Sequence, residues 1–247
     1  MTRDYEQEIQ NRIAFIREAL SAAQAEGIVY GNSGGKDSAL VGILCKLACA
    51  NTVGLIMPCG SQRNYREDMN DALTVARRYE IETRVVDLTP VREALINALA
   101  ETTTLPERAL INIAPRLRMT ALYAVATSEN RLVAGTGNRS EGYLGYFTKW
   151  GDGAYDFNPI ADLTVTEIYA FLRYLQAPEC VISKTPSAGL FDGQTDEGEL
   201  GVTYRVLDEY LLTGVVNERD QAIIERYHAA SKHKRTPPLE YGKGGRP

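Results

Sequence analysis

The stretch Ile28–Leu40, with the sequence IVYGNSGGKDSAL, contains the pattern that decides the fold. Its apolar start, Ile28–Tyr30, predicts the end of a buried strand, and the almost continuously apolar run Ala39–Ala48 predicts a buried helix. A glycine-rich turn between a strand and a helix lets backbone N–H groups approach an anion at the helix N-terminus. The turn therefore predicts a phosphate-binding loop made of Gly31, Asn32, Ser33, Gly34, Gly35, Lys36, Asp37 and Ser38.

This loop is not a Walker A loop, whose pattern is GxxxxGK[ST]. Gly31 and Gly35 are one residue too close together, and Asp37 stands where Ser or Thr is required. A carboxylate beside a phosphate repels it unless a cation lies between them, and Mg²⁺ takes one or two carboxylates together with phosphate oxygens. Asp37 is therefore predicted to be a Mg²⁺ ligand. The alternative is an ordinary tight turn in which Asp37 only favours the helix dipole.

On both sides of the loop, short apolar runs alternate with helical patterns. This alternation predicts an α/β fold, a doubly wound parallel sheet flanked by helices, in a single domain spanning residues 1–247. Gly27 is expected to end the first helix, and Pro115 is expected to break or kink a later one. Strands are expected at residues 28–30, 52–58, 82–88 and 131–136. Helices are expected at residues 5–26, 39–48, 67–80, 90–100, 107–129, 164–175, 199–212 and 217–232, with loops at 59–66 and 186–197.

The bulk composition excludes several classes of protein. The 247 residues carry a net charge of −5, so a general basic surface for nucleic acid is not expected. No apolar run approaches the roughly 18 residues of a membrane span, and the N-terminal MTRDYEQEIQ lacks the apolar core of a signal peptide. We therefore expect a cytoplasmic protein without a membrane partner. The cysteine spacing does not match a zinc site and favours small buried thiols at Cys45, Cys49, Cys59 and Cys180.

A second polar stretch, residues 135–156 (GTGNRSEGYLGYFTKWGDGAYD), follows the last predicted strand. Thr136 stands at the strand end, where ligands of doubly wound sheets bind, and can offer a hydroxyl to a nucleotide. Glu141 is a second candidate Mg²⁺ ligand, and Lys149 offers a positive charge to a phosphate or an oxyanion. Asp156 can accept hydrogen bonds from ribose hydroxyls. The alternative is a long irregular loop with a small aromatic core of its own.

The loop sequence SGGKDS at Ser33–Ser38 resembles the SGGxDS pyrophosphatase loop of the adenine-nucleotide α-hydrolase-like superfamily, whose members cleave ATP between the α- and β-phosphates. Three further segments are similar, in matching order, to the NAD⁺ synthetase family: GTGNRSEGYLGYFTKWGDGAYDFNPI, PSAGLFDGQTDEGELGVTY and HKRTPP. The resemblance extends over residues 5–238 and implies a Rossmann-like fold.

The resemblance also implies a reaction. ATP adenylates the nicotinate carboxylate of deamido-NAD (nicotinic acid adenine dinucleotide) with release of pyrophosphate, and ammonia then displaces AMP to form NAD⁺. It further implies Mg²⁺ as cofactor and a homodimer with the dinucleotide site at the interface. The loop begins too close to the first residue for a nitrilase-type amidase domain to precede it, so free ammonia is the expected nitrogen source. A separate glutaminase subunit is the alternative.

The resemblance transfers roles to individual residues. The loop Gly31–Ser38 matches the ATP loop, and the matching Mg²⁺ ligands are Asp37 and Glu141. Further ATP contacts match Thr136 and Ser187. Contacts to deamido-NAD match Arg116, Lys149, Asp156, His233 and Lys234. The alternatives are a solvated helix arginine for Arg116, a loop cap for Ser187 and a solvated basic tail for the last two residues.

One position departs from the family pattern. Where the family usually has lysine, in a segment like LTKTE, this chain has Val165. Either a neighbour such as Lys184 supplies the missing charge, or phosphate binding is weaker.

Two other functions share the loop. One is a tRNA-modifying adenylase, which the net charge and the GTGNRSE…KWGDG segment disfavour, and the other is a non-catalytic nucleotide-binding module.

Overall fold

The computed structural model describes residues 3–60, 64–184 and 196–241. Within these residues the chain forms a four-stranded parallel sheet with the strand order β3-β2-β1-β4. From β1 the chain moves to one side for two strands and later returns to the other side for the fourth, which confirms the predicted doubly wound topology. The strands are β1 (Gly27–Gly31), β2 (Thr52–Ile56), β3 (Glu82–Val85) and β4 (Arg131–Ala134).

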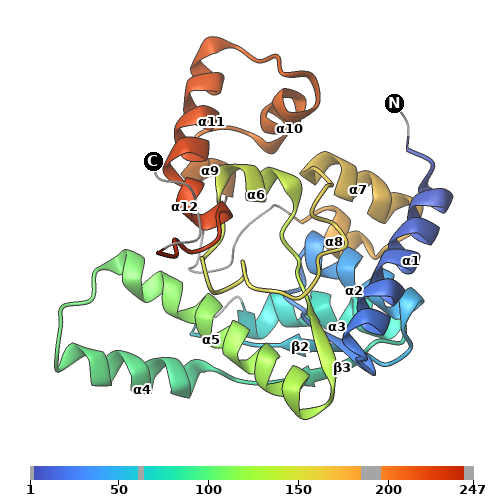
Figure 1. The fold of residues 1–247 in the computed structure, drawn as a ribbon, viewed down its shortest axis with the longest axis horizontal. Helices are drawn as coiled ribbons and strands as arrows, with labels where there is room; N and C mark the ends of the chain where they lie inside the picture. Colours follow the sequence, from blue (N-terminus) through green and yellow to red (C-terminus); the bar gives the residue numbers. More distant parts are fainter. Residues whose placement is uncertain (1–2, 61–63, 185–195, 242–247) are drawn as a thin grey trace.

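Helices cover both faces of the sheet (Figure 1). The longer ones are α1 (Tyr5–Ala23), α2 (Lys36–Ala48), α3 (Met69–Arg78), α4 (Thr89–Ala100), α5 (Glu107–Ser128), α7 (Val165–Tyr174), α10 (Tyr204–Thr213) and α11 (Glu218–Ala230). The shorter ones are α6 (Arg139–Leu144), α8 (Glu179–Ile182), α9 (Asp196–Leu200), α12 (Lys232–Arg235) and the π-helix Asn64–Asp68.

The alternation of side chains along β1 divides the core into two layers. Ile28 and Tyr30 point into the larger layer, where they pack with buried side chains of α1, α2, α3 and α7. Val29 points to the opposite face and packs with Val53 and Val133 of the neighbouring strands against α5. Burial on both faces explains why β1 and β2 are largely apolar rather than alternating, whereas the edge strand β3 is more polar and only partly buried.

Several predicted boundaries are wrong, because tertiary packing overrides local signals. The helix at 107–129 runs unbroken through Pro115, whose buried ring packs closely against Gly151. Gly27 begins β1 rather than ending α1, which stops at Ala23 with Gln24 in the left-handed conformation. The expected helix at 199–212 is two helices, α9 and α10, separated by a turn at Gly201 with a φ of 73°.

The polar stretch 135–156 contains the helix α6, so the interpretation as one irregular loop is wrong. Asn138 caps this helix by accepting a hydrogen bond from the Glu141 N–H, and the Glu141 side chain accepts one from the Asn138 N–H in return. The same pattern at the start of α7, between Thr164 and Glu167, was predicted and is confirmed. Polar residues in the first stretch therefore serve a helix start as well as a site.

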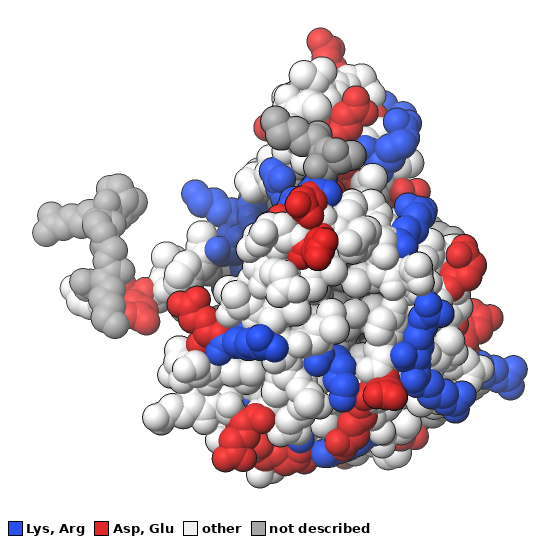
Figure 2. All heavy atoms as spheres, turned by 90° about the vertical axis from the view of Figure 1, so that its right-hand side faces the viewer, with Lys and Arg blue, Asp and Glu red and all other residues white. Residues whose placement is uncertain are grey.

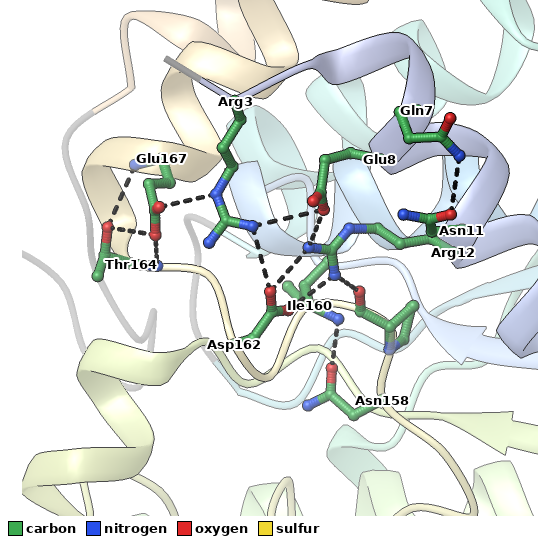
Figure 3. Close-up of polar contacts among 11 residues, drawn as sticks. Arg3, Gln7, Glu8, Asn11, Arg12, Asn158, Ile160, Asp162, Thr164 and Glu167 are labelled. Carbon is green, nitrogen blue, oxygen red and sulfur yellow. Dashed lines mark hydrogen bonds and ion pairs between the residues drawn. The ribbon is translucent and has the colours of Figure 1, made fainter. Parts of the chain in front are cut away.

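A cluster of charged side chains fastens α1 to the segment 158–164 (Figure 3). Arg12, which is buried, contacts Asp162 at 2.7 and 2.9 Å and Glu8 at 2.8 Å, and also donates to the Pro159 carbonyl. Arg3 donates to Glu167 at 2.8 Å, so the N-terminus of α7 belongs to the same cluster.

The segment fastened in this way supports the start of α6. Asn158 donates from Nδ2 to the Gly137 carbonyl at 2.8 Å, and the Arg139 N–H donates to the Leu163 carbonyl at 2.8 Å. A chain of direct contacts thus runs from α1 to the backbone that carries Glu141.

Every helix in the described ranges is too short or too polar to cross a membrane. On the face drawn in Figure 2, basic and acidic side chains of the described residues are interspersed, so neither charge forms a continuous field there. Cys45 and Cys59 are buried, as expected, while Cys49 and Cys180 are only partly buried.

Candidate active site

A cavity of about 640 Å³ opens at the carboxyl ends of β1, β2 and β4. It lies beside the point where the chain reverses its direction across the sheet, which is where doubly wound folds bind ligands. Its walls come from the glycine loop, the ends of the three strands, one face of α5, and parts of the segments 141–154 and 227–234. Both polar stretches singled out in the sequence therefore line one space.

The glycine loop has the conformation that its sequence predicts. Gly34 has a φ of 72°, and a Cβ added there would lie 2.1 Å from the Asp68 carbonyl oxygen, so only glycine fits. Gly35 is the N-cap of α2 and contributes no side-chain hydrogen bond, which leaves the first-turn N–H groups without a side-chain cap. Every residue of the loop except Gly34 lines the cavity.

The two predicted Mg²⁺ ligands lie together around one ammonium group. Lys36 Nζ is 2.7 Å from Asp37 Oδ2 and 3.9 Å from Glu141 Oε1, and its side chain is only 6% exposed. Asn138 donates from Nδ2 to Asp37 Oδ1 at 3.1 Å, so the cap of α6 joins the two halves of the site. The sequence analysis did not assign Asn138 a role, although the N-x-x-E spacing with Glu141 is a recognisable cap signal.

Burial and neighbouring charges shift the pKa values of Lys36 and Glu141. Burial, and after it the charge of Asp37, raises the pKa of Glu141 to about 8. Burial alone would lower the pKa of Lys36, but the charges of Asp37 and Glu141 outweigh it and raise that pKa above its ordinary value. Two carboxylates held this close favour any additional positive charge between them.

This donor set fits Mg²⁺, which prefers carboxylate oxygens and completes its shell with phosphate oxygens and water. Within the described ranges no group of three or more His, Cys, Asp or Glu residues is arranged to hold a metal. A two-carboxylate site suits a metal that arrives with a phosphate ligand.

Of the two remaining residues expected to contact ATP, the structure describes only Thr136. Thr136 lines the cavity just beyond the end of β4, as predicted. Ser187 lies outside the described residues. Val165 is 3% exposed and packs in the core around Leu144 and Leu207, so its side chain faces away from the cavity.

Three of the expected dinucleotide residues meet outside the cavity wall. Arg116 donates to the Lys149 carbonyl at 3.3 Å, and Lys149 Nζ donates to the His233 carbonyl at 2.6 Å. Arg116 and His233 are exposed. None of the three lines the cavity, so they form a basic cluster at its outer side.

Lys234 differs from its neighbour because it points inward. It donates from Nζ to the carbonyls of Gly145 at 2.8 Å and Phe147 at 2.7 Å, and it lines the cavity. Asp156 also differs from expectation: its carboxylate accepts hydrogen bonds from the Val133 N–H at 2.7 Å and the Tyr123 hydroxyl at 3.1 Å. Asp156 does not line the cavity, and a role in binding ribose stays a prediction.

The sequence analysis missed Arg118, the second arginine of PRLRM. Arg118 lines the cavity and donates from Nε to the Met57 carbonyl at 3.0 Å, whereas Arg116 does not line it. The spacing contains the signal, because cavity-lining residues of α5 recur at helical steps: Arg108, Ile111, Asn112, Pro115, Arg118, Met119 and Leu122.

Comparison with known proteins connects this site to a family. The family model described as NAD synthase matches residues 8–238. The NH(3)-dependent NAD(+) synthetase of Carboxydothermus hydrogenoformans is 46% identical over 96% of this chain and 98% of its own. That of Thermococcus kodakarensis is 43% identical over 84% of this chain and 80% of its own.

Solved structures agree in fold. The NMN synthetase of Francisella tularensis has a TM-score of 0.91 and 36% identity, covering 98% of this chain and 100% of its own. The NH3-dependent NAD synthetase of Campylobacter jejuni has a TM-score of 0.79 and 32% identity, covering 96% and 99%. With a glycine loop, a paired acidic site and near-complete coverage by these relatives, the chain belongs to the NAD synthase family.

Proposed function

We propose that the chain catalyses the ATP-dependent amidation of deamido-NAD by ammonia, which forms NAD⁺, AMP and pyrophosphate. The observation that carries this proposal is the meeting of the glycine loop with Asp37 and Glu141 in one cavity wall, in a chain whose curated relatives are named NH(3)-dependent NAD(+) synthetases. It is a carbon–nitrogen ligase.

The first step is adenylation. A nicotinate carboxylate oxygen attacks the α-phosphorus of ATP, the bond to the bridging oxygen of the β-phosphate breaks, and pyrophosphate departs with the electron pair. The N–H groups at the start of α2 and the ammonium of Lys36 stabilise the charge that develops on pyrophosphate. Asp37 and Glu141 would hold Mg²⁺, which would supply further positive charge to stabilise the departing pyrophosphate.

The second step is amidation. Ammonia attacks the carbonyl carbon of the acyl adenylate, the bond to the AMP oxygen breaks, and a proton is lost from nitrogen. Closure of the cavity against water matters here, because water would otherwise hydrolyse the adenylate.

The family resemblance supplies the binding roles in this proposal. It assigns Thr136 and Ser187 to ATP, and Arg116, Lys149, Asp156, His233 and Lys234 to the dinucleotide. Of these, Thr136 and Lys234 line the cavity. Because Arg116, Lys149 and His233 lie outside the cavity wall, their ligand would be enclosed best by a second subunit. A homodimer with the dinucleotide at its interface is therefore part of the proposal.

The test is an assay of the purified chain with ATP, Mg²⁺ and deamido-NAD. NAD⁺ formation with ammonium but not with glutamine is the expected result, and efficient use of glutamine would contradict it. Pyrophosphate release should depend on deamido-NAD. Release that requires tRNA would identify a tRNA-modifying adenylase, and ATP binding without release would identify a non-catalytic module.

A second candidate is the amidation that forms NMN. It is favoured by one observation: the backbone matches the Francisella tularensis NMN synthetase with a TM-score of 0.91, against 0.79 for the Campylobacter jejuni NAD synthetase. Competition between deamido-NAD and nicotinate mononucleotide in one assay decides between them. A kcat/KM higher for the mononucleotide would replace the first proposal by the second.

A further inference from the structure

Lys184 forms the most heavily coordinated ammonium group beside the glycine loop. Its Nζ lies 2.6 Å from Asp71 Oδ2, 2.8 Å from Asp68 Oδ1 and 3.2 Å from the Gly34 carbonyl oxygen, and its side chain is 15% exposed. The residue follows α8, so a distant part of the chain reaches back to the loop that begins the site.

We propose that Lys184 is a positioning residue that fixes the Gly34–Gly35 peptide group, so that the Gly35 N–H faces the phosphates of ATP. The proposal rests on ATP being a ligand of this loop, as the proposed function requires. Its role is to select one orientation of the loop, without itself contacting the phosphate.

The peptide group between two glycines needs such a constraint. Without Cβ atoms on either side, this peptide can rotate between orientations at little steric cost, and Gly34 already has a φ of 72°. In a trans peptide the carbonyl oxygen and the N–H point in opposite directions. When Lys184 holds the Gly34 oxygen, the Gly35 N–H is directed to the other side, where it donates a long hydrogen bond of 3.4 Å to Ser33 Oγ that a phosphate oxygen can replace.

Ser33 and Gly35 line the cavity, whereas Gly34 does not, and Lys184 and Asp68 line the same cavity. The Gly35 N–H therefore belongs to a residue that faces the space for the ligand. The opposite orientation would aim a carbonyl dipole at the phosphate and remove one donor from it, so it would repel the ligand that the loop binds.

The surroundings of Lys184 favour this role over direct contact with phosphate. An ammonium group has three N–H donors, and three acceptors already surround it: two carboxylates and one carbonyl. Asp71 is part of α3, so its carboxylate is held by a helix. The same helix also contacts the glycine loop directly, because Asn32 donates to the Ala72 carbonyl at 3.3 Å.

The experiment measures ATP binding by calorimetry in the absence of deamido-NAD, together with steady-state kinetics. Lys184→Met should weaken ATP binding about tenfold, the effect of a lost charged hydrogen bond, and raise the KM for ATP more than the KM for deamido-NAD. Lys184→Arg should restore part of the affinity. Lys46→Met, at a half-buried lysine in the last turn of α2, is the matched control and should bind ATP like the wild type.

The variant Asp71→Asn separates positioning from direct contact by the sign of its effect. If Lys184 positions the loop, loss of this carboxylate loosens the lysine and weakens ATP binding. If Lys184 instead contacts phosphate, removal of a competing carboxylate frees its charge and tightens ATP binding, which would overturn the proposal. Wild-type affinity in folded Lys184→Met or in Asp71→Asn would also overturn it.

A measurement without ligand completes the test. Amide hydrogen exchange and ¹⁵N chemical shifts should change at Gly34 and Gly35 in Lys184→Met and in Asp71→Asn, and unchanged signals would count against the proposal. ATP binding and the amide signals are measured without turnover. A failure to form NAD⁺ would therefore refute the proposed function but not the role of Lys184. If Lys184→Met does not fold, Asp71→Asn and Lys184→Arg carry the same comparison.

Discussion

Asp37 and Glu141 repel each other across a buried space, and Lys36 relieves part of that repulsion. In the proposed reaction, this arrangement would let one cavity wall hold a cation and a highly charged anion together. The acids would attract the cation, and the loop N–H groups with Lys36 would attract the phosphates. Substitution of any member should therefore affect chemistry more than folding.

Asp37→Asn should lower kcat at least about 100-fold while the fold remains intact, because it removes a charge expected to hold Mg²⁺ and changes little volume. Pyrophosphate release gives the rate, and thermal melting followed by circular dichroism gives the stability. An unfolded variant would instead show that this turn has only a structural role.

Lys149→Ala should raise the KM for deamido-NAD about tenfold and leave the KM for ATP nearly unchanged, because Lys149 lies in the basic cluster outside the cavity wall. Initial rates with each substrate varied in turn provide the measurement. Lys232→Ala, an exposed lysine beside that cluster, is the control. Equal increases in both KM values would contradict the role.

Residue roles differed in how far the sequence could predict them. Asp37 was predictable because its own loop makes a carboxylate conspicuous. The contacts of Lys184 and Arg118 could not be read from the sequence, since they depend on segments brought together by tertiary structure. Replacement of the missing charge at Val165 by Lys184 was one of two alternatives, and it stays untested: Lys184 lines the cavity, and three acceptors surround its ammonium group.

At the scale of elements, the contact between α1 and the segment 158–164 connects stability to the site. Burial raises the pKa of Asp162, but the hydrogen bond and charge of Arg12 outweigh it, so the pKa lies below its ordinary value of 3.8. A carboxylate with a lowered pKa in the folded state stabilises the fold above its unfolded-state pKa, and this contribution is lost as the pH falls through the folded-state value.

Asp162→Asn should therefore lower the free energy of unfolding by about 1 kcal/mol near neutral pH, because the Asp162 side chain is 55% exposed and solvent screens its ion pair with Arg12. The difference in Tm from the wild type should shrink as the pH falls below about 4, where the unfolded wild type binds a proton first and the folded-state carboxylate does so only at a lower pH. Thermal melts across a pH series give the measurement, with Glu18→Gln in α1 as an exposed control. A difference independent of pH would exclude the charge as its cause.

Elements with a complete local signal were predicted well. The start of α7 followed from the Thr164 and Glu167 pair, and the strands followed from short apolar runs. The helix at 107–129 was predicted, but a break or kink was expected at Pro115; α5 has no break there, and the packing of Pro115 against Gly151 is a tertiary contact that the sequence does not reveal. The helix α6 was not predicted, since its polar residues also suit a loop.

For the whole molecule, the outer cluster of Arg116, Lys149 and His233 leads to a prediction about assembly. Light scattering after size exclusion should give about twice the chain mass of 27.3 kDa. Dilution into the monomer range should raise the KM for deamido-NAD before it affects ATP binding. A monomer with an undiminished affinity for the dinucleotide would exclude a site shared between subunits.

The alternation of strands and helices made the parallel sheet predictable as a class, but not the strand order. That order depends on which strand pairs with β1, and no local pattern encodes the pairing of β4 with it. The positions of the two polar stretches could be expected at strand ends, whereas their meeting in one cavity required the observed order.

The pairing of β1 with β4 also has a consequence for how the protein becomes active. Val29 pairs with Val133 across roughly a hundred intervening residues, and such non-local pairings close slowly during folding. The glycine loop lies in the local unit of β1, α2 and β2, whereas Glu141 arrives only with the strand that closes the other edge. During refolding from denaturant, helical circular dichroism should therefore return before ATP turnover does. The nascent chain would therefore form the glycine loop long before Glu141 completes the site.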